Sequence, residues 1–113
     1  MTIQERINRL ESFIVANDGQ FLGQLTLNKF ASESILNPYG LYGSKFGVYS
    51  IFNQFSIYGS PYSSLSPYNQ FSTTPPSIYL KGVKKGSLTT NPFIYGAVNP
   101  YEIENWMRFY CLY

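Results

Sequence analysis

Residues 34–39 read SILNPY, and the pattern returns sixteen residues later as SIFNQF at 50–55 and again as SPYNQF at 66–71. The three copies stand in one frame, with no insertion or deletion between them. Such self-similarity at a fixed period is the sequence signature of a repeat architecture. The 16-residue repeat is therefore the feature that decides the fold.

Two further correspondences extend this repeat. Inside the units, YGSKF at 42–46 matches YGSPY at 58–62 and decays to TPPSI at 74–78. Across the whole array, GQLTLNKF at 23–30 returns as GSLTTNPF at 86–93. Because the array ends by re-entering the pattern with which it began, we expect it either to close on itself or to stack head to tail with a neighbouring copy.

Each unit carries an asparagine that is followed two residues later by an aromatic residue. In an extended segment Ile35, Asn37 and Tyr39 would share one side. A buried asparagine on such an apolar side needs a hydrogen-bond partner, and the simplest is the backbone of a turn, which it caps as an Asx turn. We predict that six asparagines are structural pins of the repeat, the alternative being that they converge on a ligand site: Asn28, Asn37, Asn53, Asn69, Asn91 and Asn99.

Short β segments account for this pattern. The Tyr-Gly-Ser signature supplies a turn in which glycine can take a positive φ. Sixteen residues accommodate a hairpin of two short strands, and one hairpin cannot bury its aromatic face alone, so the units must stack or close. We predict a mainly β fold, with an N-terminal α-helix followed by a closed or stacked array of short β-hairpin repeats. The expected organisation is an amphipathic helix at 1–18, a β-repeat domain at 19–101 and a packed C-terminal segment at 102–113.

The first residues have the marks of an amphipathic helix. Thr2 and Glu5 have the spacing of a capping box, and Asn-Asp-Gly at 17–19 is a helix stop. A stripe at steps of four and three residues predicts one apolar face on a helix over residues 3–16. The stripe either docks on its own domain or pairs with a second chain as in a coiled coil. A homo-oligomer would then form through an aromatic surface or through this stripe of Ile3, Ile7, Leu10 and Ile14.

The composition excludes several classes of function. The 113 residues contain no histidine, which excludes Ser–His and Cys–His catalysis and histidine-ligated metal sites. A single cysteine excludes an internal disulfide framework, and a formal net charge of +2 is too small to indicate a nucleic-acid partner. No apolar run reaches the roughly 20 residues of a membrane-spanning helix, and the first residues do not have the apolar core expected of a signal peptide. We therefore expect no membrane partner and a cytoplasmic location.

The remaining groups offer little catalytic chemistry. Glu33 is the one carboxylate inside the array, and it could form a glycosidase-like pair with Glu102 or Glu104 only if closure of the array brought them together. Cys111 stands among aromatic and apolar neighbours, so we expect an inert, packed thiol. We predict that the protein is not an enzyme and that it has no catalytic residue, no metal site and no cofactor.

Tyrosine and phenylalanine dominate the apolar composition. Eleven Tyr and nine Phe residues exceed what a core of this size holds, so some rings must be exposed, and exposed aromatic patches mark contact surfaces. We predict a binding or assembly module that makes protein–protein contacts through these rings. The alternative is a small-ligand module that stacks the rings of a nucleotide or a carbohydrate on the same aromatics. The candidate binding residues are Tyr42, Tyr58, Tyr62, Lys84 and Lys85.

The order of these elements resembles a widespread family of bacterial repeat domains with tandem Ser-Ile-x-Asn-x-aromatic and Tyr-Gly-Ser-x-aromatic units. The resemblance covers roughly residues 18–93, and the chain departs from it at 46–49, where many relatives are more polar. It implies a domain that stands alone or sits beside a hydrolase domain such as a trypsin-like peptidase, and it implies no catalytic residue. The segments that carry it are GQFLGQLT at 19–26, SILNPYGLYGS at 34–44, SIFN at 50–53, YGSPY at 58–62 and TPP at 74–76.

Overall fold

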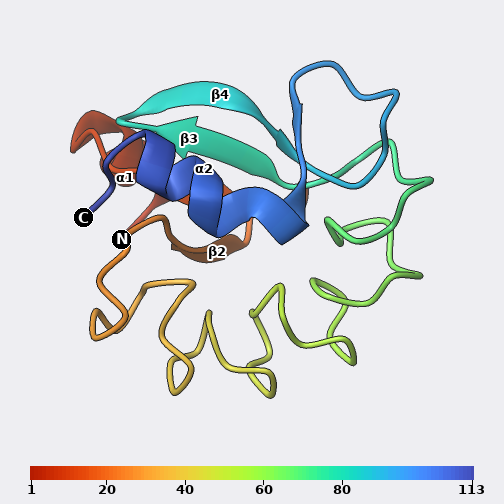
Figure 1. Ribbon diagram of the computed structural model, residues 1–113, viewed down its shortest axis with the longest axis horizontal. Coiled ribbons are helices and arrows are strands. Elements are labelled where there is room, and N and C mark those ends of the chain that lie inside the picture. The colour runs from red at the N-terminus through yellow and green to blue at the C-terminus, as the bar shows by residue number, and fades with distance from the viewer.

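Five strands form one mixed sheet (Figure 1). They lie in the order β2–β1–β3–β4–β5, and all neighbours run antiparallel except the last pair. The computed structural model describes residues 1–113, and its strands are β1 (Phe13–Val15), β2 (Phe21–Gln24), β3 (Ser77–Leu80), β4 (Val83–Leu88) and β5 (Ala97–Val98). The prediction of a mainly β fold with an N-terminal helix is confirmed, but the sheet is single and open, so the prediction of a closed array of repeats is wrong.

Two tight hairpins build most of this sheet. The turn between β1 and β2 contains Gly19, with φ 92°, and β3 and β4 are joined by Lys81 and Gly82, with φ 50° and 82°. A two-residue loop with positive φ at both positions matches the type I′ hairpin turn. Gly82 also approaches α1 (Ile3–Asn8) so closely that an added Cβ would stand 2.6 Å from the Ile7 carbonyl oxygen. This close approach seats the hairpin tip against the helix.

The N-terminal helix begins as predicted and ends early. Thr2 and Glu5 form the reciprocal capping box, with distances of 3.1 and 3.3 Å, but α1 ends at Asn8. The prediction of a helix over residues 3–16 is therefore wrong. Residues 13–15 instead form β1, which pairs on both sides with β2 and β3. Ile14 is fully buried in the sheet while Leu10 is 67% exposed with φ 58°, so the predicted stripe does not lie on one helical face.

Residues 28–72, the turn array, contain no strand, so the prediction of β-hairpin repeats is wrong. The array is a series of consecutive β-turns, in which a backbone N–H donates to the carbonyl oxygen three residues earlier. Two steps of four residues, at Ser44 and Ser60, complete the 16-residue period. The other donors all belong to small or short polar residues: Ala31, Ser34, Asn37, Gly40, Gly47, Ser50, Asn53, Ser56, Gly59, Ser63, Ser66, Asn69 and Ser72.

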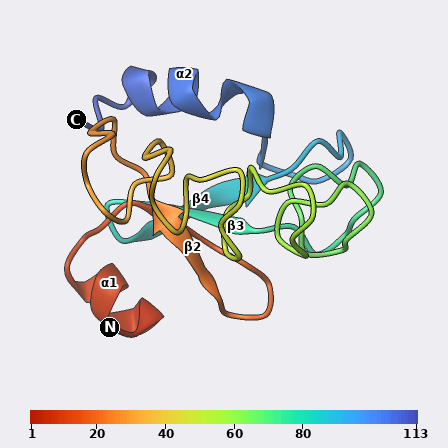
Figure 2. The same ribbon diagram turned by 90° about the horizontal axis from the view of Figure 1, so that it is seen from below.

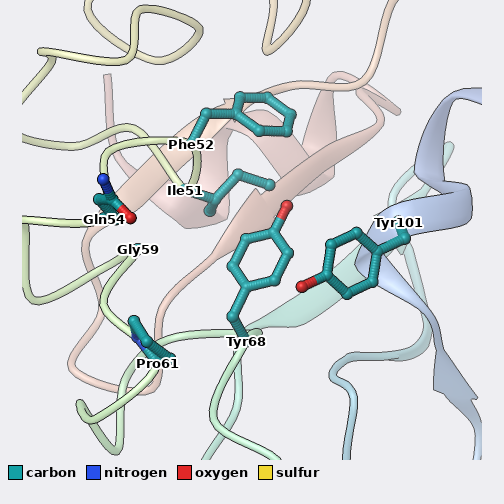
Figure 3. Close-up of a pocket in the computed structure, with 7 residues that line it drawn as sticks. All are labelled: Ile51, Phe52, Gln54, Gly59, Pro61, Tyr68 and Tyr101. Carbon is teal, nitrogen blue, oxygen red and sulfur yellow. The ribbon is translucent and has the colours of Figure 1, made fainter.

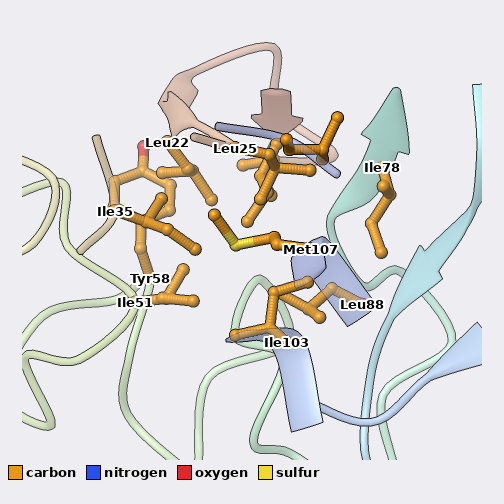
Figure 4. Packing of buried hydrophobic residues seen from close by; sticks show 12 residues of the cluster. Leu22, Leu25, Ile35, Ile51, Tyr58, Ile78, Leu88, Ile103 and Met107 are labelled. Atoms are coloured by element: carbon orange, nitrogen blue, oxygen red, sulfur yellow. The ribbon is translucent and has the colours of Figure 1, made fainter. Parts of the chain in front are cut away.

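The turn array arcs around the C-terminal helix. Figure 1 shows it as a row of small loops that leaves β2, passes around α2 (Ile103–Phe109) and returns to β3. The short helix η1 (Pro100–Glu102) leads into α2. The main core lies between the array, the sheet and α2 (Figure 4) and contains Ile35, Ile51, Tyr58, Leu22, Leu25, Ile78, Leu88, Ile103 and Met107. The array therefore curves around α2, which packs against both the array and the sheet.

The two helices lie on opposite sides of the sheet (Figure 2). Ile3 and Ile7 of α1 pack against a small cluster of Phe13, Val15 and Phe21. The C-terminal segment belongs to the other side, where Met107 and Leu112 join the main core. Cys111 is exposed, so the prediction of a packed thiol is wrong. The Leu27 N–H also donates to the Leu112 carbonyl oxygen at 2.6 Å. The end of the chain is therefore anchored beside the start of the array rather than against α1.

Candidate functional site

The asparagines of the three repeat units lie in equivalent surroundings. In Asn37, Asn53 and Asn69 the Oδ1 atom accepts the N–H two residues later, at 3.0 Å in each case. Their Nδ2 atoms donate to the carbonyl oxygen six residues earlier, at 3.2, 2.9 and 3.2 Å. One amide side chain therefore ties two successive loops of the array together, and all three side chains are directed at backbone.

The other three asparagines share the first of these hydrogen bonds. The Oδ1 atoms of Asn28, Asn91 and Asn99 accept the N–H two residues later at 3.0, 3.0 and 2.9 Å. Asn91 is buried, and its Nδ2 atom donates to the Ser72 carbonyl oxygen at 2.9 Å. The segment after β4 therefore contacts the last turn of the array and covers that end of it.

An exposed aromatic ring lies two residues after each of the six asparagines, and also two residues after Ser44 and Ser60. In these last two cases the serine Oγ accepts the hydrogen bond in place of an asparagine Oδ1, at 3.1 and 3.2 Å. We name these side chains the outer rings: Phe30 (90% exposed), Tyr39 (96%), Phe46 (85%), Phe55 (85%), Tyr62 (92%), Phe71 (81%), Phe93 (93%) and Tyr101 (74%). The backbone N–H group of each ring residue donates to the side chain two residues earlier, so the rings are fixed to ordered turns.

A second set of rings extends from Phe21 of β2 along the inner side of the array. Phe21, Tyr42, Tyr49 and Tyr58 form a ladder with successive centroid distances of 4.9, 6.4 and 6.1 Å. The Tyr58 hydroxyl donates to Asp18 Oδ2 at 2.8 Å, and burial together with this carboxylate raises the pKa of Tyr58 to about 12. Of the predicted binding tyrosines, two therefore belong to this internal ladder, and Tyr62 alone is an outer ring.

The glycine of the Tyr-Gly-Ser signature has a steric role. An added Cβ at Gly43 or Gly59 would overlap the carbonyl oxygen of Asn37 or Asn53 respectively. Neither glycine has a positive φ, so the requirement comes from close approach of two backbone segments. In this signature the tyrosine lies on the inner side of the array, the glycine lies where two backbone segments cross, and the serine begins the next turn.

A cleft lies where the end of the array meets η1 (Figure 3). The rings of Tyr68 and Tyr101 form its side, with centroids 5.1 Å apart and an interplanar angle of 64°. They enclose a hollow of about 260 Å³ with Ile51, Phe52, Gln54, Gly59 and Pro61. Burial raises the pKa of Tyr68 to about 12. We name this feature the Tyr68–Tyr101 cleft.

The cleft continues into a larger hollow of about 590 Å³. The two hollows share Pro61, Tyr68 and Tyr101. The larger one is lined in addition by Tyr62, Asn69, Gln70, Phe71 and Thr90. The Thr90 Oγ1 atom is buried and has no hydrogen-bond partner. Every residue that lines the two hollows is uncharged.

The predicted lysines lie elsewhere. Lys84 and Lys85 are exposed on β4, and Lys85 Nζ stands 5.6 Å from the centroid of the Tyr110 ring. Neither lysine lines the hollow beside Tyr62. The structure therefore does not bring the five candidate binding residues together.

The carboxylates are engaged in separate contacts. Glu33 receives two hydrogen bonds from the buried Arg6, at 2.8 and 3.1 Å, and these bonds lower the pKa of the Glu33 carboxyl. Arg6 also contacts Glu11 at 2.9 Å and lies 3.6 Å from the centroid of the Phe21 ring. Glu104 pairs with Arg108, and Glu102 accepts a hydrogen bond from Asn105. The Arg6 contacts fasten α1 to the array at Glu33.

Comparisons with protein-family models, with curated proteins and with solved structures find no match for this chain. The resemblance to the bacterial repeat domains therefore stays a prediction from the sequence. No helix has the length and apolar character needed to cross a membrane, and no group of three or more metal-ligating side chains lies together.

The sequence did not single out the cleft residues. Tyr68 occupies the repeat position of Phe52, which is the third residue of its unit, and both rings line the cleft. Alignment of the units could have marked this position as a second series of rings. The approach of Tyr101 could not be found in this way, because it depends on the path of the chain after β5.

Proposed function

We propose that this protein is a non-enzymatic assembly module whose outer rings make contacts with a second copy of the chain. The observation that supports this most is the set of eight outer rings, six of them on the turn array, each at least 74% exposed and each held on a hydrogen-bonded turn. Exposed aromatic patches of this kind mark contact surfaces.

The turn array prepares these rings for binding at low entropic cost. The backbone on each turn is already ordered, and a Tyr or Phe side chain has only two χ angles to immobilise. A buried aromatic side chain covers about 150–250 Å², and a stable interface takes about 800 Å² from each partner. Four or five outer rings therefore suffice for an interface of standard size.

The charge of the array favours a second copy as the partner. Within the array, residues 28–72, the charged side chains are Lys29, Glu33 and Lys45, and Glu33 is paired with Arg6. Two such surfaces can meet with little like-charge repulsion, and their rings can pack edge to face or offset. An isologous contact of this kind, in which the same patch is used twice, is the commonest arrangement of homo-oligomers.

Sedimentation equilibrium over a range of concentrations tests this proposal. The chain is expected to show at least twice its mass of 12.9 kDa. A triple variant of the outer rings, Phe55→Ser with Tyr62→Ser and Phe71→Ser, is expected to shift the equilibrium towards the monomer. Tyr113→Ser removes a ring that is 82% exposed outside this set and is the matched control. A monomer at millimolar concentration, or equal dissociation of both variants, would contradict the proposal.

A further inference from the structure

The Tyr68–Tyr101 cleft is built from two turns that are far apart in the sequence. The Tyr68 N–H donates to Ser66 Oγ at 3.1 Å, and the Tyr101 N–H donates to Asn99 Oδ1 at 2.9 Å. Both backbones are therefore fixed, and the rings meet at 5.1 Å. The cleft is preformed, as sites for small ligands usually are.

Polar groups of the cleft are directed into the hollow. Figure 3 shows the Tyr68 hydroxyl pointing across the hollow towards Ile51 and Phe52, and the Tyr101 hydroxyl pointing towards the Tyr68 ring. In the adjoining hollow the buried Thr90 Oγ1 lacks a hydrogen-bond partner. Because Thr90 Oγ1 has almost no accessible surface, the groups that a ligand can reach here are the two tyrosine hydroxyls.

The chemistry of the lining restricts the ligand. The polar side chains that are not already bonded to backbone are the amides of Gln54 and Gln70 together with hydroxyl groups, and no lysine or arginine is among them. A phosphate or carboxylate bound here would be desolvated without a counter-charge, which is strongly unfavourable. The ligand must be neutral and must combine an apolar face for the rings with groups that donate and accept hydrogen bonds.

A neutral sugar ring satisfies these conditions. Its C–H face can lie on an aromatic ring, and its hydroxyl groups can bond to amides and phenols. We propose that the Tyr68–Tyr101 cleft binds a neutral saccharide, with one sugar ring against Tyr68 and Tyr101 and the next extending towards Thr90. The adjoining hollow, of about 590 Å³, lies within the range of roughly 300–1,000 Å³ typical of ligand sites.

The test is a titration of the ¹⁵N-labelled chain, followed by NMR, with neutral oligosaccharides of glucose, of xylose and of N-acetylglucosamine at millimolar concentration. Nucleotides and acidic saccharides form the second arm. The expected result is that one neutral oligosaccharide shifts the amide signals of residues 52, 54, 68 and 101, and that the charged ligands do not.

Three variants assign the binding to the cleft. Tyr101→Ala removes one ring and is expected to raise Kd about tenfold, which corresponds to about 1.4 kcal/mol of binding free energy. Tyr68→Phe keeps the ring but removes its hydroxyl and is expected to raise Kd severalfold. Tyr95→Ala removes a fully exposed ring outside the cleft and should leave Kd unchanged.

Any of three results would overturn the proposal. The first is that no neutral saccharide shifts the signals of the cleft. The second is that a nucleotide or an acidic saccharide binds more tightly than the neutral ones. The third is that Tyr101→Ala and Tyr95→Ala bind alike while both retain the dispersed spectrum of the folded chain. The two proposals share Tyr62, Phe71 and Tyr101, but Tyr68 is not an outer ring. Tyr68→Phe should therefore weaken saccharide binding and leave the sedimentation result unchanged, so the two proposals can fail separately.

Discussion

The sheet and the turn array are held together by hydrogen bonds of different range. In the sheet, β1 pairs with β3, and more than sixty residues separate the partners. In the array, most of the bonds join residues two, three or six apart, and about half of them have a serine or asparagine side chain as donor or acceptor. Of 54 backbone hydrogen bonds, 36 lie outside the helices and strands. A region without strands can thus be ordered by local hydrogen bonds, provided that another element, here α2, buries its inner face.

The helix α2 packs against both regions, and a cavity in this shared core is expected to have the largest effect on stability. Met107 is fully buried and packs in the core between the sheet and the array. Met107→Ala should lower the free energy of unfolding by about 2–5 kcal/mol, because it leaves a cavity. Urea denaturation measures this loss, and hydrogen exchange should show weaker protection in both regions. Loss of protection in the sheet alone would mean that the array orders independently of α2.

A substitution at Gly59, where two backbone segments of the array cross, tests how tightly the array is packed. At Gly59 an added methyl would overlap the Asn53 carbonyl oxygen. Gly59→Ala should destabilise the chain by about 3 kcal/mol, because the backbone must shift. Gly19→Ala is the control, since nothing lies within 4 Å of its added Cβ, and its positive φ costs only about 1–2 kcal/mol. Equal effects in thermal denaturation would show that the crossing at Gly59 is not tight.

The repeat asparagine makes two hydrogen bonds, and substitutions can test the contribution of each to stability. Asn53→Ala leaves the Phe55 N–H and the Gly47 carbonyl oxygen without partners and should cost about 2 kcal/mol. Asn53→Asp keeps the acceptor and loses the donor, so about half of this cost is expected at neutral pH. Asn28→Ala, which removes only the local bond, should cost about 1 kcal/mol. An Asp variant as unstable as the Ala variant would argue against a separate role for Oδ1.

The smallest effect concerns the ion pair that fastens α1 to the array. Because Arg6 lowers the pKa of Glu33 below its ordinary 4.5, this contribution to stability is present above pH 4.5 and is lost as the pH falls through the lower, folded-state value. Glu33→Gln should therefore be less stable than the parent at pH 7, and the difference should shrink under acid. Acid titration followed by the fluorescence of Trp106 measures it. A difference that stays constant with pH would contradict this assignment.

A control for that experiment lies on the surface. Glu104 and Arg108 form an ion pair 2.9 Å apart on α2, with both side chains more than half exposed. Exposed pairs contribute little to stability. Glu104→Gln should therefore follow the parent at every pH.

The parts of the fold that depend on local interactions could be predicted from the sequence. The capping box of Thr2 and Glu5 and the placement of asparagines on turns are examples, because each involves residues two or three positions apart. The end of α1 could not be predicted, because Ile3, Ile7, Leu10 and Ile14 fit a helical period locally. The competing partner of Ile14 is Ile78, which is distant in the sequence.

The array and the site show the same limit. The 16-residue unit has a Ser, Asn, Gly or Ala at nearly every third residue, which fits consecutive turns, but alternation within the six-residue motif favours a strand and so predicts hairpins. The excess of tyrosine and phenylalanine indicated exposed rings without showing which ones. The cleft needed the structure, because Tyr68 and Tyr101 meet only after the chain has passed through the sheet.

NOE spectroscopy of residues 28–72 tests the central claim, that the repeat is an array of side-chain-capped turns. We expect sequential amide–amide contacts at each turn, no Hα–Hα contacts between paired segments, and slow exchange of the Nδ2 protons of Asn37, Asn53 and Asn69. A ladder of Hα–Hα contacts between the halves of each 16-residue unit, with rapidly exchanging Asn side chains, would show that the units are hairpins and would contradict this account.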